Sequence, residues 1–289
     1  MKSKKIKIGV VGNGFVGHAM TLLRPSIDVL VWDIIPEKRD PRNLNIEKFV
    51  KESEIIFIAV PTPMNRDGSA NLDIVISVCK EIKLIDKDKH IVLRSTVPPG
   101  TSEKLNVNFM PEFLTEKNWK QDFKNCDQWI LGSYDNLLLN KIKLILETAY
   151  NYGSIINSNV ISCEPGEAEM IKYLKNVFLS VKVGFFNELE SICLSAGLNY
   201  ENIRQIATQD KRIGAGHTMV PGPDGKRGFG GTCFPKDTNA LASFGKNKGI
   251  ETPILNAVIK RNEKIDRPEQ DWKADKGRAV SYDDSSRNI

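Results

Sequence analysis

The chain has 289 residues, enough for about two domains at roughly 150 residues each, and 40% of them are hydrophobic, as in a globular protein with a sizeable core. The net charge of +5 is small and the lysines are dispersed among acids, which argues against nucleic acid as a partner. No apolar run approaches the roughly 20 residues that span a bilayer, and no apolar segment follows the basic start MKSKK. Neither a membrane partner nor a secretory signal is therefore expected.

The five cysteines are odd in number and widely spaced, and no two of them form a CxxC pair. This usage argues against a disulfide framework or a structural zinc site, so we expect no metal and a reducing, cytoplasmic location. Four of the cysteines lie among apolar or mixed residues, as structural thiols do. Cys233 differs, because it follows the glycine-rich stretch GFGG.

The first predicted element is a β-branched strand at residues 6–11, and the loop GNGFVG follows it at once. In this G-x-G-x-x-G pattern the first glycine permits a tight turn and the second lets the backbone approach a pyrophosphate. The third lets the next helix pack on the strand. The second strand, DVLVWD, ends in an acid about 20 residues on, where a carboxylate binds the adenosine ribose. No arginine follows that acid, which favours NAD over NADP. NAD is therefore expected to contact Gly12, Gly14, Phe15, Val16, Gly17 and Asp33.

The alternative is a glycine turn beside an acidic strand end that binds nothing. Later stretches support the nucleotide site, because buried-type strands alternate with helices. Strands are predicted in EIIFIAVPTP, HIVLRSTVPPG, NVNFMPEF and DQWILGS, and a helix over residues 73–85. The alternation predicts an α/β fold with an N-terminal Rossmann-type doubly wound parallel sheet over residues 1–160. Ligands bind beyond the carboxyl ends of such strands, so the nicotinamide and substrate should meet Pro61, Thr62, Pro63, Ser95, Thr96, Pro111 and Glu112.

An all-α domain is predicted over residues 161–266, beginning with one long helix from residue 165 to Gly197. On this helix Glu169, Lys172 and Asn176 share a face. An exposed ion pair between Glu169 and Lys172 is the simpler interpretation of the first two. Shorter helices are expected at 201–209, 236–244 and 253–265, and residues 267–289 are expected to form a polar, poorly ordered tail.

Cys233 is predicted to lie just ahead of a helix, because Pro235 is favoured at a first helical position. Free amides and the helix dipole stabilise a thiolate there, and Lys236 adds positive charge. Asp237 lies in the first turn, close enough to act on a proton or a water. An activated cysteine beside a nicotinamide can hold an aldehyde as a thiohemiacetal, pass through a thioester, and so carry an alcohol to an acid with two NAD.

Seven stretches occur in the order typical of one family: GVVGNGFVG, FIAVPTP, STVPPGT, PEFLTE, EAEMIKYLKN, FFNEL and GFGGTCFPKD. Over residues 5–263 the chain thereby resembles the UDP-glucose/GDP-mannose dehydrogenase family. The resemblance implies an NAD-dependent nucleotide-sugar 6-dehydrogenase, with UDP-glucose as the first substrate to consider. It also implies a homodimer formed through the helical domain.

The resemblance implies a role for each matched residue. Cys233 would be the thioester nucleophile, and Lys172 would stabilise the alkoxide or oxyanion. Asn176 would support the same oxyanion or a sugar hydroxyl, and Asp237 would help to activate water.

Further roles follow from the other motifs. Thr96 would hold the catalytic water, Glu116 would be the general base, and Glu112 would assist it or contact the nicotinamide side. Lys236 joins the residues expected near the cofactor. The sugar nucleotide would contact Phe113, Leu114, Phe229, Gly230 and Gly231.

The chain departs from the family after its last predicted helix. Family members usually carry a further Rossmann-like domain that binds the nucleotide half of the substrate, and we expect this chain to lack it. Lys226 and Arg227, in GPDGKRG, could contact a diphosphate instead, or simply form an exposed loop. Two other functions stay open: a two-electron 3-hydroxyacid or 6-phosphogluconate-type dehydrogenase, which needs no cysteine, and a catalytically weak nucleotide binder.

Overall fold

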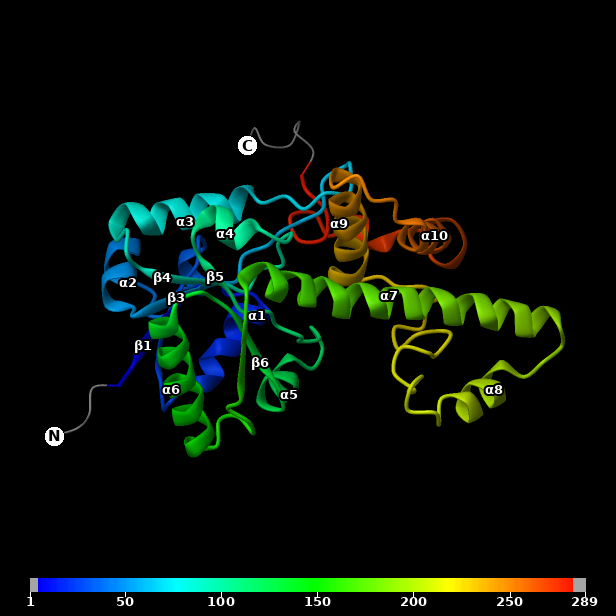
Figure 1. Ribbon diagram of the computed structural model, residues 1–289, viewed down its shortest axis with the longest axis horizontal. Helices are drawn as coiled ribbons and strands as arrows, with labels where there is room; N and C mark the ends of the chain where they lie inside the picture. The colour runs from blue at the N-terminus through cyan, green and yellow to red at the C-terminus, as the bar shows by residue number, and fades with distance from the viewer. Residues whose placement is uncertain (1–4, 283–289) are drawn as a thin grey trace. The chain divides into compact units, whose positions relative to one another are not determined.

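The computed structural model describes residues 5–282 (Figure 1). The chain divides into two compact units, the first made of Met1–Thr62 and Leu72–Lys172 and the second of Pro63–Asn71 and Tyr173–Ile289. The long helix α7, Pro165–Ser195, begins in the first unit and continues in the second. The sequence predicts domain boundaries at residues 160 and 266, whereas α7 contributes to both compact units.

The first unit contains a seven-stranded sheet in the order β2-β1-β3-β4-β5-β6-β7. Every pairing is parallel except that of β5 with β6. The strand order reverses direction between β1 and β3, which is the switch point at which such sheets bind ligands. The predicted doubly wound parallel sheet is confirmed. The strands are β1 Lys7–Val11, β2 Asp28–Trp32, β3 Ile55–Ile58, β4 His90–Leu93, β5 Asn108–Phe109, β6 Trp129–Gly132 and β7 Val160–Cys163.

Helices cover both faces of this sheet. Successive side chains of a strand point to opposite faces, and both sets are apolar here, so each face needs a covering layer. Ile8 and Val10 of β1 pack into one apolar cluster with helix α6, whereas Val11 packs into another with α2 and α3. Burial on both faces explains why the strands read as continuous apolar runs. The elements of this unit are α1 Phe15–Ala19, η1 Met20–Leu23, η2 Pro36–Lys38, α2 Ile46–Glu52, α3 Asp73–Ile85, α4 Thr101–Leu105, α5 Trp119–Lys124 and α6 Asn136–Tyr152.

The second unit is helical. After α7 it contains α8 Tyr200–Ala207, α9 Cys233–Asn247, α10 Pro253–Arg261, the π-helix η3 Asn262–Asp266 and the 3-10 helix η4 Asp271–Ala274. No helix in residues 5–282 is long and apolar enough to cross a bilayer.

The segment expected to be a poorly ordered tail packs onto this unit up to residue 282. Trp272 is 3% exposed and Ala279 is fully buried. The Met64 N–H donates to the Ala279 carbonyl at 3.0 Å, and the Ser281 N–H donates to the Met64 carbonyl at 2.8 Å. The buried Trp272 side chain and a short backbone pairing thus hold a segment whose composition is polar. Residues 283–289 lie outside the described residues.

Candidate functional site

The glycine loop after β1 contains glycines of two kinds. Gly12 has φ +91°, and a Cβ there would lie 2.6 Å from the Ala59 carbonyl oxygen. A Cβ on Gly17 would lie 1.8 Å from the Gly12 carbonyl oxygen, so these two glycines are required by the fold itself. A Cβ on Gly14 would have no heavy atom of the described chain within 4 Å. Gly14 therefore leaves open space beside the backbone, which is what a pyrophosphate approaching the loop requires.

Asp33 joins the end of β2 to this loop. Its carboxylate accepts the Asn13 N–H at 2.8 Å and the Ile35 N–H at 2.9 Å, and the residue is 8% exposed. A carboxylate offers about four lone-pair positions, so capacity remains for ribose hydroxyls. Phe15 and Val16 are the first two residues of α1 and are half-buried.

The predicted strand-end residues tie β3 to β4. The Thr62 hydroxyl donates to the Thr96 carbonyl at 2.8 Å, and the Ser95 hydroxyl donates to the Val60 carbonyl at 2.7 Å. All three predicted hydroxyl residues are buried, whereas Pro61 is exposed. These bonds fix the loop backbones at the carboxyl ends of the strands, where ligands bind in this fold.

Lys172 forms a buried ion pair with Glu112. Lys172 Nζ lies 2.6 Å from Glu112 Oε1 and 2.5 Å from the Glu112 carbonyl oxygen, and the two residues are 2% and 7% exposed. The other carboxylate oxygen of Glu112 accepts the Leu114 N–H at 2.8 Å. Lys172 Nζ also lies over the face of the Phe113 ring, 5.5 Å from the ring centroid. Lys172 is thus held by a carboxylate, a carbonyl and an aromatic face.

The simpler interpretation of Glu169 as the surface partner of Lys172 is wrong. Glu169 is fully buried, and it accepts the Gly100 N–H at 2.6 Å and the Ser102 N–H at 2.7 Å at the start of α4. Burial raises the pKa of its carboxyl group, and these hydrogen bonds oppose the rise. Glu169 serves the amides of a helix start, because unpaired N–H groups there need acceptors.

Arg94 is a buried residue next to the predicted residue Ser95, and the sequence analysis did not single it out. It directly precedes Ser95 and is 2% exposed, and its Nε and Nη1 have no hydrogen-bond partner in the described part of the chain. Burial lowers the pKa of the guanidinium, whereas the charge of Glu112 raises it. The sequence does carry a signal for this residue, since an arginine directly follows the apolar run HIVL. A charge buried at such a position costs free energy unless it is paired or hydrogen-bonded.

Glu116, the predicted base, differs from Glu112 in its surroundings. It is exposed, whereas Glu112 is buried.

The helix at Cys233 begins earlier than predicted. Cys233 is the first residue of α9 and Thr232 is its N-cap, so Pro235 is the third helical residue and not the first. Proline is tolerated there because the first N–H groups of a helix have no intrahelical acceptor. Cys233 is partly exposed, and its Sγ lies 3.7 Å from the Thr232 hydroxyl.

Asp237 lies one turn after Cys233 and is 1% exposed. One carboxylate oxygen accepts from Asn176 Nδ2 at 2.6 Å, and the other lies 2.5 Å from Lys236 Nζ. The three predicted residues Asn176, Lys236 and Asp237 are therefore brought into contact. In the preceding loop Phe229 is buried, whereas Gly231, with φ +69°, has open space beside it.

Both cations of GPDGKRG form ion pairs with carboxylates of the same chain. Lys226 lies 2.9 Å from Asp271 and 3.2 Å from Glu269. Arg227 binds Glu190 and donates to the Ser191 hydroxyl at 2.8 Å. Since carboxylates already neutralise both side chains, the loop offers a diphosphate less charge than its sequence indicates.

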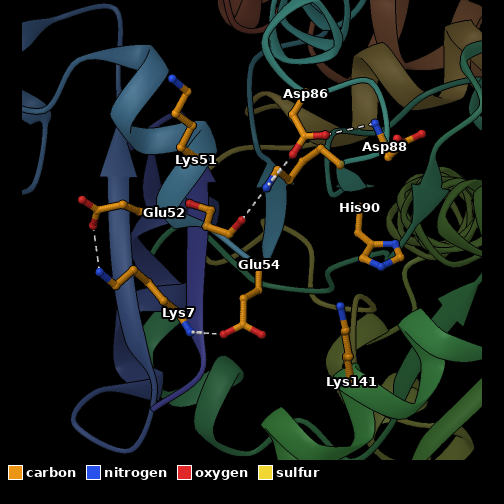
Figure 2. A pocket seen from close by; sticks show the side chains of 10 residues that line it. Lys7, Lys51, Glu52, Glu54, Asp86, Asp88, His90 and Lys141 are labelled. Carbon is orange, nitrogen blue, oxygen red and sulfur yellow. Dashed lines mark hydrogen bonds and ion pairs between the residues drawn. The ribbon is translucent and has the colours of Figure 1, made fainter. Parts of the chain in front are cut away.

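A cavity of about 570 Å³ lies in the first unit among residues at the amino ends of β1, β3 and β4 (Figure 2). Four lysines and four carboxylates line it together, so it has no excess of either charge. Figure 2 shows Lys7 engaged with Glu52 and Glu54. None of the predicted site residues lines this cavity, and ligands in doubly wound sheets bind at the opposite strand ends.

Comparison with known proteins decides the family. The NAD binding domain of the UDP-glucose/GDP-mannose dehydrogenase family matches residues 41–150, and the central domain of that family matches residues 166–264. The chain belongs to this family.

The proteins similar to this chain are named for different substrates. The chain is 32% identical to UDP-glucose 6-dehydrogenase YwqF of Bacillus subtilis over 83% of its own length and 56% of that protein. It is 28% identical to a GDP-mannose 6-dehydrogenase of Pseudomonas savastanoi over 89% of its length and 60% of that protein. A UDP-glucose dehydrogenase structure from Pyrobaculum islandicum aligns with a TM-score of 0.78 and 28% identity, covering 91% of this chain and 69% of that one. The chain thus spans little more than half the length of these curated relatives.

Proposed function

We propose that this chain is an NAD-dependent nucleotide-sugar 6-dehydrogenase that oxidises a primary alcohol to a carboxylate, with UDP-glucose to UDP-glucuronate as the first reaction to test. The observation that carries the proposal is Cys233 at the first residue of α9, followed one turn later by the buried Asp237 held by Asn176 and Lys236. A thiol at a helix start beside a fixed carboxylate suits covalent catalysis.

NAD fits the residues of the first unit. Open space beside Gly14 and the remaining acceptor capacity of Asp33 match the needs of a pyrophosphate and a ribose. When bound, NAD supplies the acceptor for hydride. Gly12, Gly17 and the tied strand ends at Thr62 and Ser95 would keep the loop shape that the cofactor needs.

The cysteine divides the oxidation into two parts. Loss of the first hydride from the alcohol gives an aldehyde, and Cys233 Sγ adds to its carbonyl carbon to form a thiohemiacetal. Loss of a second hydride leaves a thioester, and water breaks its C–S bond to release the carboxylate and restore the thiol. One alcohol, one water and two NAD⁺ become one carboxylate, two NADH and three protons.

The remaining roles follow the residue chemistry. Lys172 would stabilise negative oxygen in the reaction, since Glu112 and the Phe113 face hold its ammonium in place. Asp237 would help to activate water and Thr96 would hold it, with Asn176 as a further donor. Glu116 would act as the general base.

The substrate class is tested by following NADH with NAD and a panel of substrates. We expect formation of NADH from UDP-glucose, GDP-mannose or UDP-N-acetylmannosamine, and none from 3-hydroxyacids or 6-phosphogluconate. Turnover of a 3-hydroxyacid with no response to any nucleotide sugar would favour the two-electron alternative.

We also propose that the chain forms a homodimer through α7. Four large apolar residues spaced by four, seven and seven positions form a stripe along this helix, and each is 58 to 61% exposed: Leu174, Phe178, Phe185 and Ile192. This spacing places them on one helix face, and continuous apolar stripes of this kind mark interfaces.

Phe178→Asp is expected to convert the dimer to a monomer, because a carboxylate in an apolar interface costs several kcal/mol unless it is paired. Light scattering at micromolar concentration should give twice the chain mass for the parent and the single mass for the variant. Leu84→Asp is the control, since Leu84 is an exposed apolar residue of a different helix, α3. A monomeric parent would contradict the proposal.

A further inference from the structure

The loop Gly228–Gly231 leads directly into Thr232 and Cys233, and one amide side chain holds both backbone polar groups of Phe229. The Phe229 N–H donates to Asn262 Oδ1 at 2.8 Å, and Asn262 Nδ2 donates to the Phe229 carbonyl at 2.9 Å. Asn262 is 2% exposed. A side-chain amide can both accept and donate in this way, which a carboxylate cannot.

Gly228, the residue before Phe229, is held by a second amide side chain and lies against Asn262. Its N–H donates to Asn187 Oδ1 at 3.0 Å, and its φ is +64°. A Cβ on Gly228 would lie 2.3 Å from Asn262 Oδ1. The loop glycine is thus required partly because Asn262 occupies the space beside it.

Arg267 lies against the next loop residue. A Cβ on Gly230 would lie 2.5 Å from Arg267 Cζ. The guanidinium is itself fixed, because its Nε and Nη2 bind Asp271 at 2.8 and 2.7 Å and its Nη1 binds Asp224 at 2.6 Å. Arg267 is 4% exposed, so its guanidinium packs against the loop backbone and is not accessible to a ligand.

We propose that Asn262 and Arg267 are positioning residues, which fix the backbone of Phe229 and Gly230 and thereby the place of Cys233 at the start of α9. The inference rests on the proposed role of Cys233 as the nucleophile. A reacting atom displaced by about 1 Å can lose about 100-fold in rate, so a rigid lead-in to Cys233 matters to the chemistry. Arg267 lies beyond the residues matched by the family's central domain.

The test compares Asn262→Asp with the parent by hydrogen exchange and by kinetics. The variant keeps the shape of the side chain but cannot donate to the Phe229 carbonyl. Amides in residues 226–234 should exchange about fivefold faster or more, as expected for the loss of one net hydrogen bond. We expect kcat to fall about 10- to 100-fold, with the KM for NAD within about twofold of the parent.

Asn256→Asp is the matched control, because Asn256 is exposed on α10 and the charge change is the same. It should leave both exchange and kcat unchanged. Arg267→Lys is the second variant and serves if Asn262→Asp does not fold, since lysine keeps the charge and loses the planar fork. It should accelerate exchange in residues 226–234 and lower kcat in the same way.

Hydrogen exchange separates this inference from the proposed function, because it needs no turnover. Faster exchange in Asn262→Asp would show that Asn262 holds the loop before Cys233 even if the parent oxidised no nucleotide sugar. Unchanged exchange in both variants would overturn it. Faster exchange with an unchanged kcat would also overturn it, because the contacts would then serve the fold alone.

Discussion

Cys233→Ser is expected to lower kcat for carboxylate formation by at least about 10⁴-fold, the scale seen when a covalent nucleophile is removed. A serine hydroxyl at neutral pH is far less nucleophilic than a thiolate at a helix start, and it yields no thioester. Steady-state NADH formation and chromatography of the product measure the loss. A small, substoichiometric release of NADH with aldehyde-level sugar retained on the enzyme would fit interruption after the first oxidation.

Cys163→Ser provides the control for this change. Cys163 is also partly exposed, but it ends strand β7 in the first unit. This variant should keep the parent rate within about twofold, because the thiol has no part in the proposed chemistry. A Cys233→Ser enzyme that retained a tenth or more of the parent rate would rule out the thioester route.

Lys172→Met is expected to lower both activity and stability. The variant removes the cation nearest Glu112 and leaves that carboxylate buried, which typically costs about 3 to 5 kcal/mol. Loss of one electrostatic stabiliser of negative oxygen should lower kcat about 10²- to 10³-fold. Urea unfolding followed by circular dichroism measures the first effect, and NADH formation measures the second.

The double variant Lys172→Met with Glu112→Gln separates the two effects. A neutral amide in place of the carboxylate should recover part of the lost unfolding free energy, because no charge then remains from the pair, whereas the buried Arg94 loses the nearby charge of Glu112. Activity should not recover, since the ammonium is still missing. If Lys172→Met alone left stability and kcat close to the parent values, the buried pair would have neither role.

Much of the sheet could be predicted, because parallel strands buried on both faces appear as continuous apolar runs. The helix predicted at residues 73–85 has the observed bounds. Strand β7 carries no such run, since Ile161 and Ser162 at the sheet edge are exposed.

Helix α6 was not predicted, although its sequence contains signals for both ends. The Asp135 carboxylate accepts the Leu137 N–H at 2.8 Å at the start of the helix, and Gly153, with φ +84°, ends it. Those residues are ordinary start and stop signals for a helix.

Candidate site residues could be named from motifs, but several of the contacts that these residues make could not be predicted. Helical spacing pairs Lys172 with Glu169, whereas its partner in the structure is Glu112, 60 residues away. Periodicity describes neighbours along one helix and contains no information on contacts made across the fold. The same limit hid Asn262, whose amide binds the backbone of Phe229, 33 residues distant.

The number of NADH molecules formed per molecule of limiting nucleotide sugar is the decisive measurement for the proposed four-electron oxidation. The reaction is run to completion with excess NAD and followed by absorbance. We expect two NADH and one carboxylate per sugar, because Cys233 would retain the aldehyde for the second oxidation. One NADH per sugar, with an aldehyde or ketone as product, would contradict the cysteine route and place the chain among the two-electron dehydrogenases.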